Sequence, residues 1–199
     1  MNTPTHAILN LALLGRERTR RGWAFVVAGA AIPDVPIVFF FLTSRFIYRI
    51  PSGEMWTRAY FVSDWQHAID ALHSFPLIAL AFALAWWRKW ADGQLLFASM
   101  FLHSVGDFPL HVEDAHRHIY PIAWEFHSPV SYWDPRHHGA WGATLELVLL
   151  LAAAVVVVRR ARSRWARGAA GGYAALHLLA WAVLVLGSGG GWQAMLHPK

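Results

Sequence analysis

Long apolar stretches separated by short polar segments dominate the chain. Four stretches are apolar over roughly the 20 residues that a bilayer-crossing helix needs: 22–42, 68–87, 93–111 and 141–158. A fifth stretch, residues 169–186, is weaker than these four because Gly171 and Gly172 interrupt it. Residues 3–14 are also apolar, but they would form a helix only about 20 Å long, which predicts a partial or re-entrant span.

This pattern predicts an all-α fold, a polytopic transmembrane helix bundle with four to five spans and a short N-terminal helix. The composition agrees, because 56% of the residues are hydrophobic and only 15% are charged, against about 25% charged in ordinary globular proteins. A length of 199 residues is that of one domain. We therefore expect residues 1–199 to form a single membrane domain.

The basic residues indicate how the spans are oriented. The net charge of +5 could suggest nucleic-acid binding, but the basic residues lie in short clusters between apolar stretches, as in loops that flank membrane spans. With five spans, the segments 16–21, 88–92 and 159–167 fall on one side and hold eleven Lys and Arg, against six on the other. The positive-inside rule makes the first side cytoplasmic. Membrane lipids, and not nucleic acid, are the expected partners.

The connection 112–140 falls on the non-cytoplasmic side and is rich in histidines and aromatic residues. Its aromatic residues and prolines predict a packed cap over the end of the bundle. Carboxylates accompany the histidines there, and we expect such a cluster to bind metal, to form pH-sensitive pairs or to be a solvated surface. Half of the twelve histidines lie at its start or within it: His111, His116, His118, His127, His137 and His138.

Ionisable residues also occur inside the apolar stretches, where they are costly and indicate function. His103, Asp107 and His111 are one helical turn apart, so they share a face. Asp34, after Pro33, lies at a similar depth to Asp107, and His6 is expected at the same end. Buried carboxylates need neutralisation, which a divalent cation provides. The alternatives are a kink capped by Asp34, a local His103–Asp107 pair, or a structural or proton-sensing network.

The chain contains no cysteine, so any metal must be held by imidazole and carboxylate. This donor set favours Zn, with Mn or Fe as alternatives. We expect His6, Asp34, His103 and Asp107 as the main ligands. His73, near the start of the second span, and His111 are expected as additional ones. Glu146, near the start of the fourth span, is interpreted as an acid at a span end.

Four short motifs occur in a fixed order: Pro4-Thr5-His6, Ile32-Pro33-Asp34, Leu72-His73-Ser74 and His103-x-x-x-Asp107. Over about residues 1–125 they resemble the bacterial membrane-bound metal-dependent hydrolases, including inner-membrane hydrolases described as LexA-binding. The resemblance implies a multi-pass protein of the bacterial inner membrane. This chain departs from the family at Pro36, where a second acid often follows the Pro-Asp pair. Its histidine-rich stretch after His111 is also more elaborate.

These features together predict metal-assisted hydrolysis of a lipid or lipid-linked phosphoester or ester at the outer half of the bilayer. A bound cation would polarise the substrate oxygen and acidify a water molecule. Asp114 is the expected base, because it follows the ligand helix directly, and His118 is the alternative. The competing hypothesis is a non-enzymatic metal-binding membrane protein. Transport is disfavoured because the cytoplasmic halves of the spans are almost wholly apolar.

Overall fold

The computed structural model describes residues 1–15, 19–62, 64–110, 118–122 and 141–186. Every regular element in these ranges is helical, which confirms the all-α prediction. The longer helices are α1 (Thr3–Leu14), α2 (Arg20–Ala31), α3 (Val35–Leu42), α6 (Trp65–His73), α7 (Phe75–Trp87), α8 (Ala91–Asp107), α10 (Trp141–Arg160) and α11 (Arg164–Leu186). The short ones are η1 (Ile32–Asp34), η2 (Thr43–Ile47), α4 (Ser52–Glu54), η3 (Met55–Ala59), α5 (Tyr60–Val62) and η4 (Phe108–Leu110).

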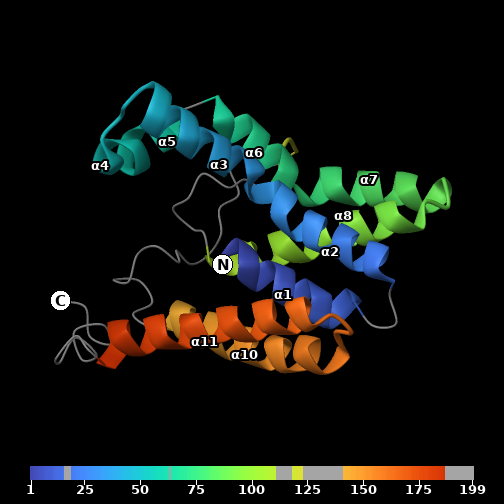
Figure 1. Cartoon of the computed structure of the whole chain (residues 1–199). Helices are drawn as coiled ribbons and strands as arrows, with labels where there is room; N and C mark the ends of the chain where they lie inside the picture. Colours follow the sequence, from blue (N-terminus) through green and yellow to red (C-terminus); the bar gives the residue numbers. More distant parts are fainter. Residues whose placement is uncertain (16–18, 63, 111–117, 123–140, 187–199) are drawn as a thin grey trace.

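Helix α1 lies in the middle of the bundle, against α2, α8 and α10 (Figure 1). Helix α7 packs along α8, and α11 packs along α10 on the opposite side. A buried apolar cluster joins these helices through Ile8, Val26, Leu95, Leu150 and Val157, among others. The short N-terminal helix has the predicted bounds. It is a central packing element and brings the residues near the N-terminus among the longer helices.

Two helical segments of the described chain are long and apolar enough to cross a membrane: Arg20–Ile47 and Gly142–Arg160. A third is added if α6 and α7 count as one bent span. The first continues through η1 beyond the predicted end at residue 42. Helix α8, with 17 residues, and α11 are outside this set, so the total of four to five spans stays a prediction.

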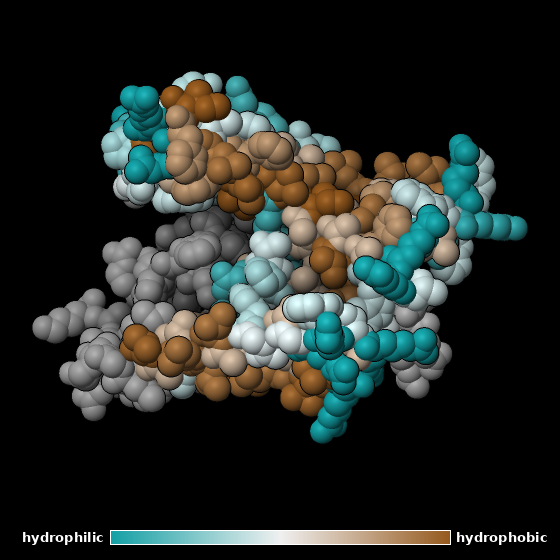
Figure 2. Space-filling model, viewed as in Figure 1, coloured by the Kyte–Doolittle hydropathy of each residue, from teal (hydrophilic) through white to brown (hydrophobic). Residues whose placement is uncertain are grey.

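Large apolar side chains are exposed along several helices, as expected for a surface that faces lipid (Figure 2). In water such continuous exposure would be costly, since contiguous apolar patches are rare on soluble monomers. In a bilayer, such apolar patches contact lipid chains and need no protein partner. Examples are Val38, Phe39 and Leu42 on α3, Leu80, Leu84 and Trp87 on α7, Val148 and Val155 on α10, and Leu176, Leu179 and Val183 on α11.

The second predicted span is broken, in contrast to the continuous helix 68–87 that the hydrophobic pattern indicated. Its two halves, α6 and α7, meet at Ser74 with a bend of 56°. Ser74 has an extended backbone and its hydroxyl accepts a hydrogen bond from the Leu77 amide, while Pro76 lies in the first turn of α7. A serine N-cap and an early proline are signals that start a new helix. The break places His73 at the end of α6.

The connections that carry most of the basic residues gather at one end of the bundle. Helices α1, α7 and α10 end there, and α2, α8 and α11 begin there (Figure 1). Figure 2 shows long hydrophilic side chains projecting at the same end, on the right of the view, and a second hydrophilic group at the upper left. This arrangement agrees with the predicted grouping of the basic segments on one face of a membrane.

Gly29 allows α2 and α8 to approach each other closely. A Cβ atom at this position would lie 2.2 Å from the carbonyl oxygen of Leu96 and 2.8 Å from the Cβ of Ser99. Because this oxygen belongs to the backbone, the clash can be relieved only if the two helices move apart. Small residues have this function at many helix contacts in membranes. The close approach matters for the site because α8 carries His103 and Asp107.

We expect Gly29→Ala to destabilise the protein by about 1–3 kcal/mol, as overpacking does in other cores, and to weaken metal binding. Gly172→Ala in α11 is the matched control, because a Cβ there meets nothing within 4 Å. It should leave stability unchanged or raise it slightly through helix propensity. Thermal unfolding in detergent and metal content measure both effects. Equal behaviour of the two variants would contradict the close α2–α8 packing.

Candidate metal centre

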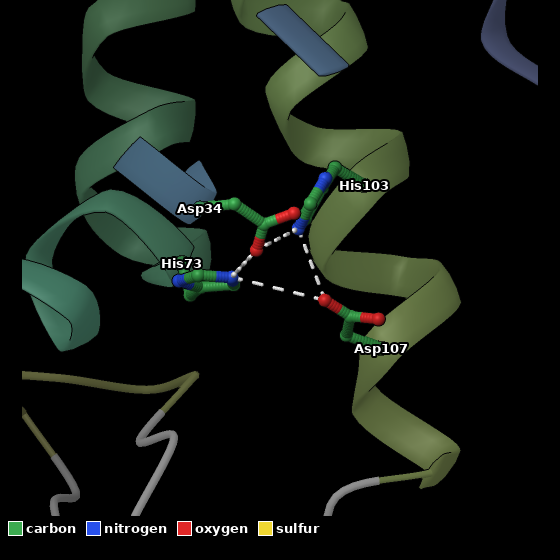
Figure 3. Close-up of side chains that lie close together, drawn as sticks. All are labelled: Asp34, His73, His103 and Asp107. Atoms are coloured by element: carbon green, nitrogen blue, oxygen red, sulfur yellow. Dashed lines mark ion pairs between the residues drawn. The ribbon is translucent and has the colours of Figure 1, made fainter. Parts of the chain in front are cut away.

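Four side chains from three separate elements converge on one point: Asp34, His73, His103 and Asp107 (Figure 3). One potential ligand atom from each lies within 4.8 Å of the other three. The Nε2 atom of His103 is 3.0 Å from Oδ2 of Asp107 and 3.5 Å from Oδ1 of Asp34. The Nε2 atom of His73 is 3.7 Å and 3.8 Å from the same two oxygens.

Local backbone structure explains why these residues meet. His103 and Asp107 are one turn apart on α8 and point to the same side. Asp34 ends the 3-10 turn η1, which Pro33 introduces between α2 and α3. His73 is the last residue of α6, before the break at Ser74. Two donors thus come from one regular helix, and the other two come from positions where a span is interrupted.

Both histidines are fixed by their other ring nitrogen. Nδ1 of His103 lies 2.8 Å from the carbonyl oxygen of Ala30, and Nδ1 of His73 lies 2.8 Å from that of Ile69. A carbonyl oxygen only accepts hydrogen bonds, so each Nδ1 must carry the proton. In a neutral ring the lone pair then belongs to Nε2, which faces the two carboxylates. Metal-binding histidines are commonly held in this way.

The donor geometry fits a divalent cation. Zinc lies about 2.0–2.1 Å from nitrogen and carboxylate ligands, so neighbouring donors in a tetrahedral site are about 3.3 Å apart. The four histidine–carboxylate distances, 3.0–3.8 Å, bracket this separation, and all four donor atoms lie within 4.8 Å of one another. Nε2 of His103 and Oδ2 of Asp107 face each other at 3.0 Å across this point. Both groups are oriented toward a shared point.

Burial and charge favour the same interpretation. His73 and His103 are fully buried, Asp107 is 2% exposed, and Asp34 is 17% exposed. Two carboxylates with two neutral imidazoles carry a charge of −2; the ammonium of Met1, 2.6 Å from Oδ1 of Asp107, balances one unit of it, and a cation at the shared point would balance the remainder. Burial of that charge without compensation would be very costly. The alternative, a network of imidazolium–carboxylate pairs, requires a proton on both nitrogens of each ring.

His6, predicted as a main ligand, lies beside the four-residue group and not within it. Its Nε2 atom is 2.9 Å from Oδ1 of Asp107, the oxygen that faces away from His103, and its ring stacks on that of His103 at 3.9 Å. The amine of Met1 is 2.6 Å from the same Oδ1. His6 therefore orients Asp107 and supports His103 from the side of α1.

We expect His6→Ala to weaken metal binding by about 10–100-fold, the usual cost of losing a partner that orients a ligand. Asn10→Ala is the matched control, because Asn10 lies one turn further along α1 and joins this helix to Ser99 of α8. It should weaken helix packing with little effect on affinity. Metal titration of both purified variants tests this. Equal losses would mean that His6 acts only through the packing of α1.

His118, the alternative base, is buried beside His73. The two ring centroids are 6.0 Å apart, and Phe75 and Phe108 flank His118 at 5.5 Å. Its carbonyl oxygen accepts a hydrogen bond from the Phe75 amide, while the Ser74 hydroxyl donates to the carbonyl of Tyr120. The break in the second span thus binds the described part of the predicted cap, residues 118–122. His111 and Asp114 lie outside the described residues.

Several polar residues that support the site were not predicted from the sequence. The hydroxyl of Thr3 donates to Oδ2 of Asp34. Glu146, interpreted as an acid at a span end, is buried, and its Oε1 accepts hydrogen bonds from the Asn2 amide, the Asn2 side chain and the Thr5 hydroxyl at 2.7–3.0 Å. Glu146 thus attaches α10 to the start of α1. The available signal was the cluster of short polar residues before an apolar helix.

Comparisons with family models, curated proteins and solved structures gave no match to this chain. The resemblance to membrane-bound metal-dependent hydrolases therefore rests on its four motifs alone. Three of them supply Asp34, His73, and the His103–Asp107 pair to the cluster. The first supplies His6, which contacts the cluster from outside. The fold and site define a helical protein with membrane-length apolar helices and a His/Asp group able to hold a metal ion.

Proposed function

We propose that this protein is a membrane-embedded metal-dependent hydrolase, multi-pass in a bacterial inner membrane, that cleaves a lipid or lipid-linked phosphoester or ester. One observation carries the proposal. Two buried histidines, each anchored through Nδ1 to a backbone carbonyl, direct Nε2 toward two carboxylates at distances of 3.0–3.8 Å. Four donors from interrupted and regular helices are thus preorganised around one point, which is what a catalytic metal site requires.

In this proposal Asp34, His73, His103 and Asp107 hold the cation, with zinc favoured by the donor set and Mn or Fe as alternatives. The cation would supply Lewis acidity toward a phosphoryl or acyl oxygen and a more acidic water. Among the four ligands, Asp34 is the most exposed, at 17%. Substrate is therefore expected to approach from the side of Asp34, with His6 and Asp107 behind the cation.

The remaining chemical task of the protein is to accept the proton of the attacking water. Asp114 is the proposed base on sequence grounds, since it follows the ligand helix. His118 is the alternative, and its position 6.0 Å from the ring of His73 keeps it close to the site. A buried imidazole in an aromatic surrounding favours the neutral form, because burial disfavours charge. A neutral imidazole is able to accept a proton.

The depth of the site favours a lipid-like substrate. Asp34 lies 14 residues beyond the start of α2 at Arg20. This is about 20 Å along the helix from the basic end, the end of the bundle where the basic connections gather. A hydrocarbon core is about 30 Å thick, so this depth corresponds to the half of the bilayer away from the basic end. The positive-inside rule makes that the outer half. The apolar side chains exposed on α3 would leave the neighbouring surface open to lipid.

The test is hydrolysis of a panel of phospholipids, lipid-linked phosphates and chromogenic esters by the purified protein in detergent. We expect turnover of at least one substrate, loss after treatment with a chelator, and recovery on addition of Zn, Mn or Fe. Turnover that survives chelation would contradict a metal-dependent reaction. Tight metal binding without turnover on any substrate would favour the non-enzymatic metal-binding alternative.

A further inference from the structure

A second candidate site lies at the basic end of the bundle, on the opposite end of α2 from Asp34. A cavity of about 1040 Å³ opens there, and its described lining comes from Gly15, the start of α2, the end of α10 and the start of α11. It is separate from the group of Asp34, His73, His103 and Asp107, and shares no lining residue with it. The side chains that give it chemical character are Thr19, Arg20, Trp23, Arg160, Arg162 and Trp165.

The described side chains that line this cavity carry charge of one sign. Arg20, Arg160 and Arg162 line it, and the described lining residues include no carboxylate. Arg160 donates one hydrogen bond, from Nη1 to the carbonyl oxygen of Ala12 at 2.9 Å, which holds its guanidinium over the end of α1. Arg21, next to Arg20, differs because it pairs with Asp92 at 2.8 Å and does not line the cavity.

The lining groups suit a phosphate. Guanidinium groups present several N–H donors in a planar arrangement that matches phosphate oxygens. Helices α2 and α11 both begin at this cavity, so backbone amides of their first turns add to the positive potential. Thr19 and Ser163 add hydroxyl groups at the rim. Three arginines from two separate parts of the chain, one at the start of α2 and two at or just after the end of α10, give a stronger signal than either helix start alone.

We propose that this cavity binds the phosphodiester headgroup of an anionic membrane lipid. It lies where the apolar helices end, at the level expected for headgroups, and basic pockets between helices on that side are typical lipid-headgroup sites. Trp23 and Trp165 line it, and tryptophan is enriched at the membrane–water interface. The volume exceeds that of a lone phosphate ion and leaves room for the glycerol part of a headgroup.

The experiment is native mass spectrometry of the full chain in detergent, titrated with phosphatidylglycerol. We expect saturable binding of one lipid per chain, with phosphatidylcholine bound at least about ten-fold more weakly. Inorganic phosphate and glycerol phosphate are added as competitors in separate arms. Displacement of the lipid only at high phosphate concentrations supports a lipid site. Phosphate binding as tight as that of the lipid would overturn it in favour of a soluble phosphate ligand.

Variants of equal charge separate the cavity from general electrostatics. Arg20→Gln with Arg162→Gln should weaken phosphatidylglycerol binding by at least about ten-fold, because each guanidinium can donate charge-assisted hydrogen bonds to the phosphate. Arg88→Gln with Lys89→Gln removes the same charge from the same end but outside the cavity, and should change affinity less than about three-fold, because salt screens charges that do not contact the headgroup. Equal losses in both variants would overturn the proposal. Unchanged metal content in both shows that the fold is retained.

Discussion

The variants His103→Ala and Asp107→Ala are each expected to lose nearly all bound metal. Both side chains are buried, and their facing atoms are 3.0 Å apart at the centre of the four-residue group. Removal of one ligand leaves three donors with incomplete geometry and an altered buried charge. The loss of metal affinity should therefore be larger than the loss of about 10–100-fold that follows when a hydrogen-bond partner of a ligand is removed. Metal content after purification in detergent is the measurement.

His177→Ala is the control for this comparison. His177 is also a histidine of an apolar helix, but it lies on α11, with its ring 5.8 Å from that of Tyr173. Its removal should leave the metal content at the wild-type value. Equal metal content in all three variants would mean that His103 and Asp107 form a structural pair. A loss in all three would point to general destabilisation of the bundle.

The second large effect concerns the base. If Asp114 accepts the proton of the attacking water, Asp114→Asn should retain the metal and lower turnover by about 10²–10⁴-fold. The amide has nearly the same shape as the carboxylate, but it is a very poor base. The loss should be larger at pH 6 than at pH 9, because hydroxide competes as the nucleophile at higher pH. Rates at both pH values on the best substrate of the panel give the result.

His118→Gln provides the matched comparison. If Asp114 is the base, the His118 variant should retain most activity, with a small loss from its contacts with His73 and Phe75. The opposite ranking would assign the base to His118, the buried neighbour of the site. Loss of metal in Asp114→Asn would instead make Asp114 a ligand. Full activity in both variants would exclude each of them as the base.

The group of Asp34, His73, His103 and Asp107 was predictable from the sequence to the extent that local rules determine it. His103 and Asp107 share a face because the helical repeat places residues i and i+4 together. Asp34 could be placed at the same depth because its distance from the start of its helix is known from the helical rise. His73 was predicted only as an additional ligand, yet it is one of the four converging residues. Its position depends on the break at Ser74.

That break shows where a hydrophobic pattern is insufficient. Residues 68–87 are apolar enough for one span, and hydropathy does not register a change in backbone direction. The cues were local: Ser74 in an N-cap position and Pro76 two residues later. The place of His6 was also not determined by the sequence. Its expected depth in the membrane placed His6 near Asp107. Only the packing of α1 against α2, α8 and α10 shows that His6 faces Oδ1 of Asp107, the oxygen that points away from His103.

Glu146 shows the same limit for a long-range contact. Its position in α10 indicated an acid near a span end, which is commonly solvated. The structure buries it against Asn2 and Thr5, more than 140 residues away in the chain. No local pattern links those positions. The contact requires α10 to pack on α1, and packing between distant helices depends on shape along their whole length.

The central claim is that Asp34, His73, His103 and Asp107 hold a divalent cation. Elemental analysis of the wild-type protein, purified in detergent without added metal or chelator, tests it most directly. We predict close to one equivalent of a single divalent metal per chain, with zinc favoured by two imidazoles and two carboxylates. A folded protein that contains no metal, and that takes up none of Zn, Mn or Fe on titration, would contradict the claim.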